Sequence, residues 1–212
     1  CVSLGSSVGQ NELDFCMGAW RRKLFVGDSS QEIRGLVELM DNNPLVCADS
    51  ASVPSPMGTL CLIALGPLFR AGMVVEPPVI HTNAPGSCEG FLEEVQVEFE
   101  EQDLGSVYIA TAMAVITTPD DWKEIDELYE ESFGRSFYVR SSTEADWNIA
   151  SVAGRPWAIY RLRMTPDEPH SLLTIQVMAD QNGKCGAAQV VHAMNVMAGL
   201  EECLGIPELI PT

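Results

Sequence analysis

Apolar and polar positions follow a clear period in several segments of the chain, and these segments predict a sheet. Residues 95–99 alternate valine or phenylalanine with glutamine or glutamate, which predicts a strand with one buried face and one acidic, solvated face. Residues 107–116 are almost wholly apolar and predict a central strand covered on both faces. Residues 158–164 and 172–178 predict two further strands, and the proline-rich stretch between them predicts a hairpin.

Helical spacing of apolar residues predicts one helix near the amino end of the chain. Its apolar positions are Ile33, Leu36, Val37 and Met40. Ser29 or Ser30 precedes them as a candidate cap, and Pro44 follows two asparagines as a stop signal.

Two more helices are predicted in the second half of the chain. Thr118 as cap and Pro119 at the first position predict the start of one helix, and Gly134 predicts its end. Its apolar stripe consists of Ile125, Leu128, Tyr129 and Phe133. The last helix is predicted to end at Gly205 to Pro207, and its packing residues are Val190, Val191, Met194 and Met197.

The longest apolar stretch, residues 57–75, predicts a buried helix. Pro67 and Arg70 interrupt it, so we expect no membrane span and no direct membrane insertion. Together the segments predict an α+β fold in which a mixed sheet is backed by helices. The chain has 212 residues and is 46% apolar, which is enough for one sizeable core and a small appendage.

The charge balance restricts the partners that the chain can bind. Thirty acidic side chains against twelve basic ones give a formal net charge of −18, so nucleic acid and anionic membrane surfaces would repel the protein. A basic protein surface is a better candidate partner. The alternative is that the acidity only maintains solubility.

The cysteines and histidines indicate the compartment and the absence of a metal site. Seven cysteines form no C-x-x-C pair, and their odd number favours an intracellular, reducing environment over a secreted disulfide scaffold. The three histidines show no metal-ligand spacing, so we expect no metal. A reactive Cys88 near His81 is a minor candidate, because most buried cysteines act as small hydrophobes.

The sequence begins at Cys1, which leaves the localisation open. Removal of an initial methionine, trimming of an organellar transit peptide, or residues upstream of this sequence would each explain that start. We expect a soluble intracellular protein, and a plastid or mitochondrial location is one alternative.

Residues 180–195 resemble the near-terminal helix of N-acetyl-gamma-glutamyl-phosphate reductases, whose pattern reads DNLVKGAAGQAVQNMN. The coinciding positions are Asp180, Lys184, Ala187, Gln189, Val191, Met194 and Asn195. Residues 124–140 resemble the preceding helix and strand of the same family, and residues 64–73 and 79–90 resemble two earlier segments in family order. The resemblance covers roughly residues 48 to 210.

The resemblance implies an acyl-phosphate or semialdehyde substrate that a cysteine thiolate attacks to form a thioester. In this chain Ser52 stands where that cysteine belongs, and a serine without a base is a poor substitute. Gln102 is nearest to the family's histidine base, and the phosphate-binding arginine is missing. An amide neither accepts a proton near neutral pH nor replaces a cation.

The nucleotide-binding half of the family is also largely missing. Only 47 residues precede Ala48, and a dinucleotide-binding domain needs several βαβ repeats. The glycine-rich stretch from Gly5 to Gly9 lacks the G-x-G-x-x-G spacing and is expected to be a loop. We therefore expect no cofactor, although the reductase alternative would use NADP. The family-matching positions for cofactor binding are Asp180, Lys184, Gln189 and Asn195.

The resemblance also implies a domain organisation. Residues 48–212 correspond to the substrate and dimerisation domain of the semialdehyde dehydrogenases, and residues 1–47 to an appendage or a remnant of the nucleotide-binding domain. In the family the terminal helix packs against the nucleotide domain, so either residues 1–47 or another protein must cover it here. A homodimer or another protein partner is expected.

Three functional hypotheses follow from these observations. The first is a noncatalytic structural or interaction subunit of a larger assembly, derived from the reductase-like domain. The second is an NADP-dependent reductase whose nucleotide-binding part lies outside this sequence or belongs to another chain. In that case the match at Ser52 is displaced by a few residues, toward Cys47 or Cys61. The third is a sensor of an amino-acid metabolite, in which Arg155 or Arg135 replaces the missing arginine.

Overall fold

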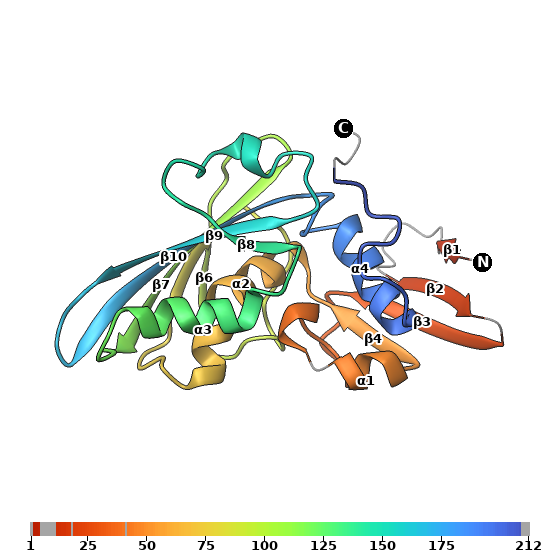
Figure 1. Ribbon diagram of the computed structural model, residues 1–212, viewed down its shortest axis with the longest axis horizontal. Helices are drawn as coiled ribbons and strands as arrows, with labels where there is room; N and C mark the ends of the chain where they lie inside the picture. Colours follow the sequence, from red (N-terminus) through yellow and green to blue (C-terminus); the bar gives the residue numbers. More distant parts are fainter. Residues whose placement is uncertain (1, 5–11, 18, 41, 209–212) are drawn as a thin grey trace.

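The computed structural model describes residues 2–4, 12–17, 19–40 and 42–208. The loop predicted from Gly5 to Gly9 lies outside these residues, as does Cys1. The described chain forms two sheets and four α-helices (Figure 1).

The larger sheet, which we call sheet B, has six strands in the order β6-β5-β7-β10-β9-β8. Its strands are β5 (Val79–Thr82), β6 (Gln96–Phe99), β7 (Val107–Thr117), β8 (Val139–Ser141), β9 (Ala158–Thr165) and β10 (His170–Asp180). The central pairs are antiparallel, whereas β5–β6 and β8–β9 are parallel. The mixed sheet and the β9–β10 hairpin confirm the predictions from the sequence.

The smaller sheet, sheet A, has the order β1-β2-β3-β4. Its strands are β1 (Val2–Leu4), β2 (Glu12–Met17), β3 (Trp20–Val26) and β4 (Ser50–Val53). The helices are α1 (Asn42–Cys47), α2 (Pro56–Ala71), α3 (Lys123–Phe133) and α4 (Ala187–Ala198), with short 3-10 turns at η1 (Val37–Leu39) and η2 (Ile149–Ser151).

Helix α2 forms the centre of the main core. Ser55 caps its first turn by accepting a hydrogen bond from the Gly58 amide at 3.2 Å, and Gly72 ends it in the left-handed conformation. Residues 57–68 are all buried, which confirms the buried helix predicted from the apolar stretch. Among the described residues, no helix is long and apolar enough to cross a membrane.

Helices α2 and α3 cover one face of sheet B, as Figure 1 shows. Along β7 the buried residues on that face are Ala110, Ala112, Ala114 and Ile116, whereas Thr111, Met113 and Val115 on the other face are only partly buried. The prediction of a strand covered on both faces is therefore wrong. The small alanines let α2 approach the sheet closely, and the opposite face has no helix over it.

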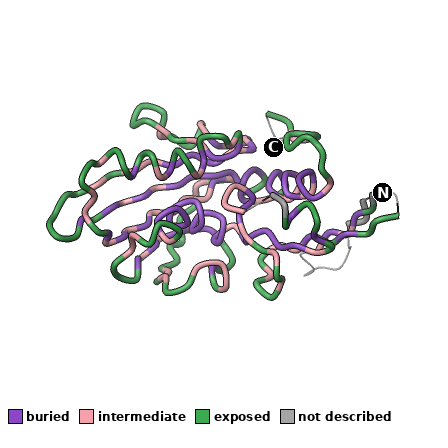
Figure 2. The backbone as a smooth tube through the Cα atoms, turned by 60° about the horizontal axis from the view of Figure 1, so that its bottom comes forward, coloured by how far each residue is buried: buried purple, intermediate pink, exposed green. Residues whose placement is uncertain are grey.

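Sheet A and helix α4 enclose a second, smaller core. Its buried members include Leu13, Leu24 and Val53 from the sheet, and Val196 and Met197 from the helix. The apolar face of α4 is thus covered by strands of the same chain, and Figure 2 shows the buried stretches of both elements. The guanidinium of Arg22, which is also buried, donates to the Met197 carbonyl and ties β3 to the end of α4.

The helix predicted over residues 33–40 does not form. The Ser52 amide donates to the Ile33 carbonyl at 2.9 Å, and the Gly35 amide donates to the Ser52 carbonyl at 3.0 Å. Residues 33–35 therefore run alongside β4, and Gly35 has a φ of 143° that favours glycine. Pro44 lies in the first turn of α1, where a proline is tolerated, so it starts a helix instead of stopping one.

The predicted boundaries of α3 and α4 also need correction. Helix α3 begins at Lys123, because the Thr118 hydroxyl donates to the Asp167 carbonyl at 2.6 Å instead of capping a helix. Its predicted stripe is confirmed, since Ile125, Tyr129 and Phe133 are buried and Leu128 packs against the main core. Helix α4 ends at Ala198, where Gly199 adopts the left-handed conformation, and not at Gly205.

Strand β6 was predicted to bury one face, and this is only partly correct. Val97 is half-buried, but Phe99 is 61% exposed at the edge of sheet B. Helix α2 packs on the central strands β7 and β10, so the edge strand has little cover.

Candidate functional site

Ser52 and Gln102, the two family positions for nucleophile and base, lie on different parts of the fold. Ser52 belongs to β4 and is 1% exposed; its hydroxyl accepts from the Asp28 amide at 3.1 Å and donates to the Val53 carbonyl at 3.3 Å. Gln102 lies on an exposed loop after β6, and its carbonyl accepts from the Asn83 side chain at 2.9 Å. Among the described residues no hydrogen bond joins the two side chains, so they form no nucleophile–base pair.

A cleft of about 970 Å³ lies at the amino end of α2. The segment 85–90 closes one side of it and is held to the first turn of the helix. The Met57 amide donates to the Pro85 carbonyl at 3.0 Å, and the Ser55 hydroxyl donates to the Ser87 carbonyl at 2.8 Å. Three carboxylates, those of Glu89, Glu93 and Glu94, line the same cleft. An acidic lining disfavours an acyl phosphate.

Arg135 and Arg155 do not line this cleft. Arg155 lies over the Trp157 ring at 5.3 Å, and Arg135 is exposed beside a different hollow of about 150 Å³. The structure therefore places neither arginine where it could replace the missing phosphate ligand of the cleft.

His81 and Cys88 face different surroundings. The Nδ1 atom of His81 lies 3.3 Å from a Glu98 oxygen and 3.1 Å from a Glu100 oxygen, so its ring is engaged at the edge of sheet B. Cys88 lines the cleft, is 6% exposed and belongs with Cys61 of α2 to the main core.

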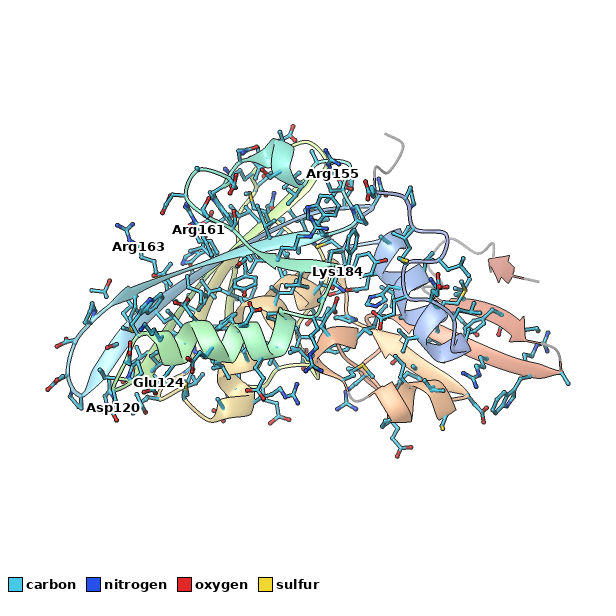
Figure 3. All side chains as sticks on the ribbon, in the orientation of Figure 1. Asp120, Glu124, Arg155, Arg161, Arg163 and Lys184 are labelled. Atoms are coloured by element: carbon cyan, nitrogen blue, oxygen red, sulfur yellow. The ribbon has the colours of Figure 1, made fainter. Side chains whose placement is uncertain are left out.

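Asp180 and Lys184, the first two family-matching positions, are occupied with internal contacts. The carboxylate of Asp180 accepts from the Ser106 hydroxyl at 2.6 Å and from the Gly154 amide at 2.9 Å. The ammonium of Lys184 donates to both Glu38 oxygens at 2.6 and 2.8 Å, and it is fully buried. Figure 3 shows Lys184 between sheet B and α4.

Gln189 and Asn195 are likewise buried on α4 and bind the chain itself. The Gln189 amide donates to the Pro54 carbonyl at 3.1 Å and to the Thr59 hydroxyl at 3.0 Å. The Asn195 amide donates to the Glu202 and Leu204 carbonyls at 3.0 and 2.8 Å. All four family-matching side chains are thus engaged in contacts within the chain.

His192 completes a buried polar cluster that the sequence analysis did not identify. Its Nε2 atom lies 3.0 Å from a Glu202 oxygen, and its ring packs on Tyr138 at 4.6 Å. Burial, together with the adjacent Lys184 charge, lowers the pKa of His192 below its ordinary value of 6.5. The neutral ring donates through Nε2, which leaves the buried Nδ1 atom without a hydrogen-bond partner.

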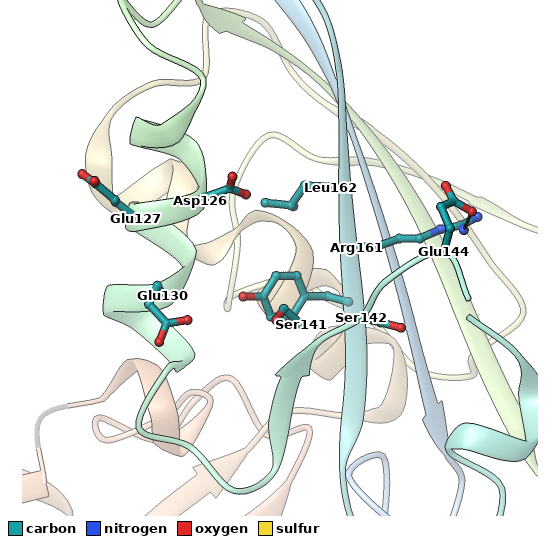
Figure 4. Close-up of a pocket in the computed structure, with 9 residues that line it drawn as sticks. Asp126, Glu127, Glu130, Ser141, Ser142, Glu144, Arg161 and Leu162 are labelled. Atoms are coloured by element: carbon teal, nitrogen blue, oxygen red, sulfur yellow. Dashed lines mark hydrogen bonds and ion pairs between the residues drawn. The ribbon is translucent and has the colours of Figure 1, made fainter. Parts of the chain in front are cut away.

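A second hollow of about 540 Å³ lies between α3 and strands β8 and β9 (Figure 4). Asp126, Glu127 and Glu130 line it from α3, and burial raises the pKa of Asp126. Arg161 at the rim of the hollow points away from α3 and is paired with Glu144 at 2.6 Å. The described residues contain no group of three histidine, cysteine or acidic side chains placed to hold a metal ion.

The uncovered side of sheet B forms a surface that we call the open face. Its members are Val79, His81, Gln96, Glu98, Thr111, Met113, Val115, Arg161, Arg163, Leu172, Thr174 and Gln176. Residues 147–157 cover only one end of this side, where Trp147, Val152 and Trp157 pack on Ile159 and Met178. In Figure 3, Arg161 and Arg163 project from β9 away from α3.

Charge changes sign across the open face. The register places Glu98, His81, Thr111, Gln176 and Arg161 in one row. The Arg161 side chain donates to Gln176 at 2.7 Å, and Gln176 donates to Thr111 at 3.3 Å. The β6 side is therefore acidic, and the β9 side carries two arginines, of which Arg161 is paired with Glu144.

Comparison with solved structures identifies the fold. Aspartate semialdehyde dehydrogenase II from Vibrio cholerae matches with a TM-score of 0.57 and 13% identity, over 79% of this chain and 68% of that chain. The same enzyme complexed with ASA matches with a TM-score of 0.56. This chain carries a semialdehyde dehydrogenase-like fold.

The sequence comparison agrees with this fold. N-acetyl-gamma-glutamyl-phosphate reductase of Bacillus cereus (strain B4264) is 22% identical over 198 residues. The match covers 74% of this chain but only 56% of the relative, so the semialdehyde dehydrogenase-like chain spans about half of that protein's length. No protein-family model matches. The resemblance and the α+β fold class predicted from the sequence are thereby confirmed.

Proposed function

We propose that this semialdehyde dehydrogenase-like chain is a noncatalytic interaction subunit that assembles through the open face of sheet B. The observation that carries the proposal is the open face itself, a side of the main sheet that no α-helix of the described chain covers and that residues 147–157 cover only at one end. The partner that we propose is a second copy of the chain, which gives a homodimer.

The internal use of the family-matching residues supports a noncatalytic role. Lys184, Gln189 and Asn195 bind Glu38, Pro54 and the segment after α4. A cofactor would have to displace these contacts, and each lost contact would leave a buried polar group unpaired. Sheet A also occupies the face of α4 that packs against the nucleotide domain in the family.

The charges on the open face support a particular two-fold symmetry. A two-fold axis parallel to the strands stacks β5 and β6 of one copy over β9 and β8 of the other, because the strand order reverses across the axis. This arrangement brings the side of the open face that carries Glu98 to the side that carries Arg163. An axis across the strands would stack β9 over β9 of the other copy and bring their arginines to the same side, where like charges repel.

Sedimentation velocity of the purified chain tests this proposal. We expect a dimer at micromolar concentration, and added NADP should neither bind nor shift the unfolding temperature. A stable monomer at all concentrations would remove the basis for the assembly role. Saturable NADP binding, or reduction of NADP with N-acetylglutamate semialdehyde and phosphate, would support the reductase alternative instead.

A further inference from the structure

Strand β6 forms one edge of sheet B, and no strand of the described chain pairs with its outer side. The Gln96 and Glu100 amides donate toward the β5 side at 2.9 Å each. Because backbone groups alternate in direction along a strand, the N–H and C=O groups of Val97 and Phe99 point away from β5. The outer side of β6 therefore offers unpaired backbone donors and acceptors to another extended chain.

The cleft at the amino end of α2 continues along this edge. Val95, Val97 and Phe99 line it together with Leu92 and Met57. The Phe99 side chain is apolar, yet the residue is 61% exposed. Unpaired backbone and apolar surface thus lie next to each other, and the cleft of about 970 Å³ has room for the side chains of an added strand.

The edge is strongly acidic. No lysine or arginine occurs between residues 71 and 122, and the one histidine there, His81, already contacts two carboxylates. Two copies joined edge to edge would bring the acidic side chains of both strands together, where like charges repel. The charge therefore disfavours a second copy at this edge and favours a basic partner. The acidic residues in and beside β6 are Glu93, Glu94, Glu98, Glu100 and Glu101.

We propose that the outer edge of β6 takes up an extended basic segment of a partner protein as an added antiparallel strand. Antiparallel pairing is the more stable arrangement per residue. Main-chain hydrogen bonds supply affinity in this mode of binding, and alternate side chains supply specificity. Apolar side chains opposite Val97 and Phe99 face the cleft, whereas the basic side chains between them lie on the same side of the sheet as Glu98 and Glu100.

This inference does not depend on the proposed dimer. The dimer contact uses side chains on the open face of sheet B, whereas an added strand extends the sheet in its own plane. Glu98 belongs to both surfaces, but Glu93 and Glu94 line the cleft and are absent from the open face. A chain that proves to be monomeric would leave the test below unchanged.

The probe is an acetylated and amidated decapeptide of alternating lysine and valine, titrated into the unsubstituted full chain. We expect saturable binding, and amide exchange measured by NMR locates it. The Val97 and Phe99 amides should exchange more slowly by about tenfold or more at saturation, because they gain hydrogen-bond acceptors. The Gln96 and Glu100 amides are already bonded and should change little.

Three modified peptides identify the contact as strand addition. N-methylation of every valine removes the donors that would pair with β6, so binding should be lost. N-methylation of every lysine changes only the other edge of the peptide and should alter the affinity by less than about twofold. Replacement of every lysine by glutamate should weaken binding by about tenfold or more.

Two double variants of the chain test the charge of the cleft. Glu93→Gln with Glu94→Gln should weaken binding of the lysine–valine peptide by about threefold or more, and the defect should shrink as salt rises. Glu127→Gln with Glu131→Gln is the matched control, because it removes the same charge from exposed positions of α3. Its affinity for the peptide should stay close to that of the unsubstituted chain.

The peptide measurements alone decide the proposal, since they use the unsubstituted chain. Absence of saturable binding would overturn it. Binding without slower exchange at Val97 and Phe99 would overturn it equally, because the peptide would then lie elsewhere. Equal affinity of the peptides methylated at valine and at lysine would show that no strand is added at β6.

Discussion

At the scale of single residues, Lys184 and Glu38 form an ion pair from which water is excluded. Burial alone would raise the pKa of Glu38, but the charges of Lys184 and His192 hold it below its ordinary value of 4.5. Such a pair adds little to the free energy of unfolding relative to an apolar pair of the same shape. Loss of one partner, however, leaves a buried charge uncompensated.

We expect Lys184→Met to lower the free energy of unfolding by roughly 3–5 kcal/mol. The double variant Lys184→Met with Glu38→Leu should recover much of that loss, because no buried charge remains. Urea unfolding measures the free energy of unfolding of the single and the double variant. Lys23→Met is the matched control, since Lys23 pairs with Glu12 at an exposed site and its loss should change stability little. An equal loss in the control would contradict the argument.

The buried His192 predicts a loss of stability on acidification. Its pKa is lowered in the folded state, so below the ordinary value of 6.5 the unfolded chain binds more protons. The folded state therefore loses up to about 1.4 kcal/mol per pH unit as the pH falls from 6.5 toward the folded pKa. Glu38 adds to this loss below its ordinary value of 4.5, because its pKa is also lowered.

Urea unfolding at several pH values between about 7 and about 5 measures this dependence. In His192→Gln the slope should become shallower, since no proton uptake by this residue accompanies unfolding. His170→Gln serves as the control because His170 is exposed. If the control flattened the slope as much as His192→Gln, the cluster would not be its source.

The four family-matching residues could be found from the sequence, but the contacts that they make within the chain could not. Asp180, Lys184, Gln189 and Asn195 were identified from the family pattern. Only the structure shows that Glu38, far away in the sequence, neutralises Lys184.

At the scale of elements, the start of α2 depends on one side chain. Ser55 accepts from the Gly58 amide and also holds Ser87 of the facing segment. Ser55→Ala should therefore lower the free energy of unfolding by about 1–2 kcal/mol. Ser29→Ala is the control, because Ser29 is exposed near the same cleft. Thermal unfolding of both variants decides whether the cap contributes as expected.

The small core of sheet A and α4 should behave as a unit of its own. Its buried residues form a cluster distinct from that of α2 and sheet B. Leu24→Ala leaves a cavity in this cluster and should reduce hydrogen-exchange protection in β2, β3 and α4. Protection of β7 and β10 should persist. Uniform loss of protection across both sheets would show that the two cores unfold together.

Elements with a strong local pattern were predicted well, and their ends less so. Helix α2 follows from a long apolar stretch that is buried in the main core. The β9–β10 hairpin follows from two strand-like segments joined by a proline-rich turn. The segment around Ile33 has helical spacing as well, but backbone bonds to Ser52 outweigh its local preference. Helix α3 begins late because Thr118 bonds to a turn that the sequence does not place beside it.

At the scale of the whole molecule, the open face predicts an electrostatic dimer contact. Arg163→Glu replaces the basic edge with an acidic one and should weaken the dimer tenfold or more, an effect of about 1.4 kcal/mol or greater. Glu98→Arg in the same chain should restore part of the affinity. Sedimentation equilibrium at low and high salt measures both, and the defect should shrink as salt rises.

Arg70→Glu is the matched control, because Arg70 lies at the end of α2, on the side of sheet B away from the open face. The proposed symmetry would be wrong if Arg163→Glu left the dimer unchanged, or if Glu98→Arg weakened it further. A dimer that is equally sensitive to Arg70→Glu would point to a different contact surface.

The packing of β3 against α4 also has a consequence for synthesis on the ribosome. The Arg22 side chain and the Met197 carbonyl that it binds are 175 residues apart. At typical translation rates, strands β2 to β4 emerge on the order of ten seconds before α4 does. During that interval the apolar side of a small sheet has no partner in the nascent chain. Premature termination after β10 would leave this side permanently uncovered, and we expect such fragments to depend on chaperones.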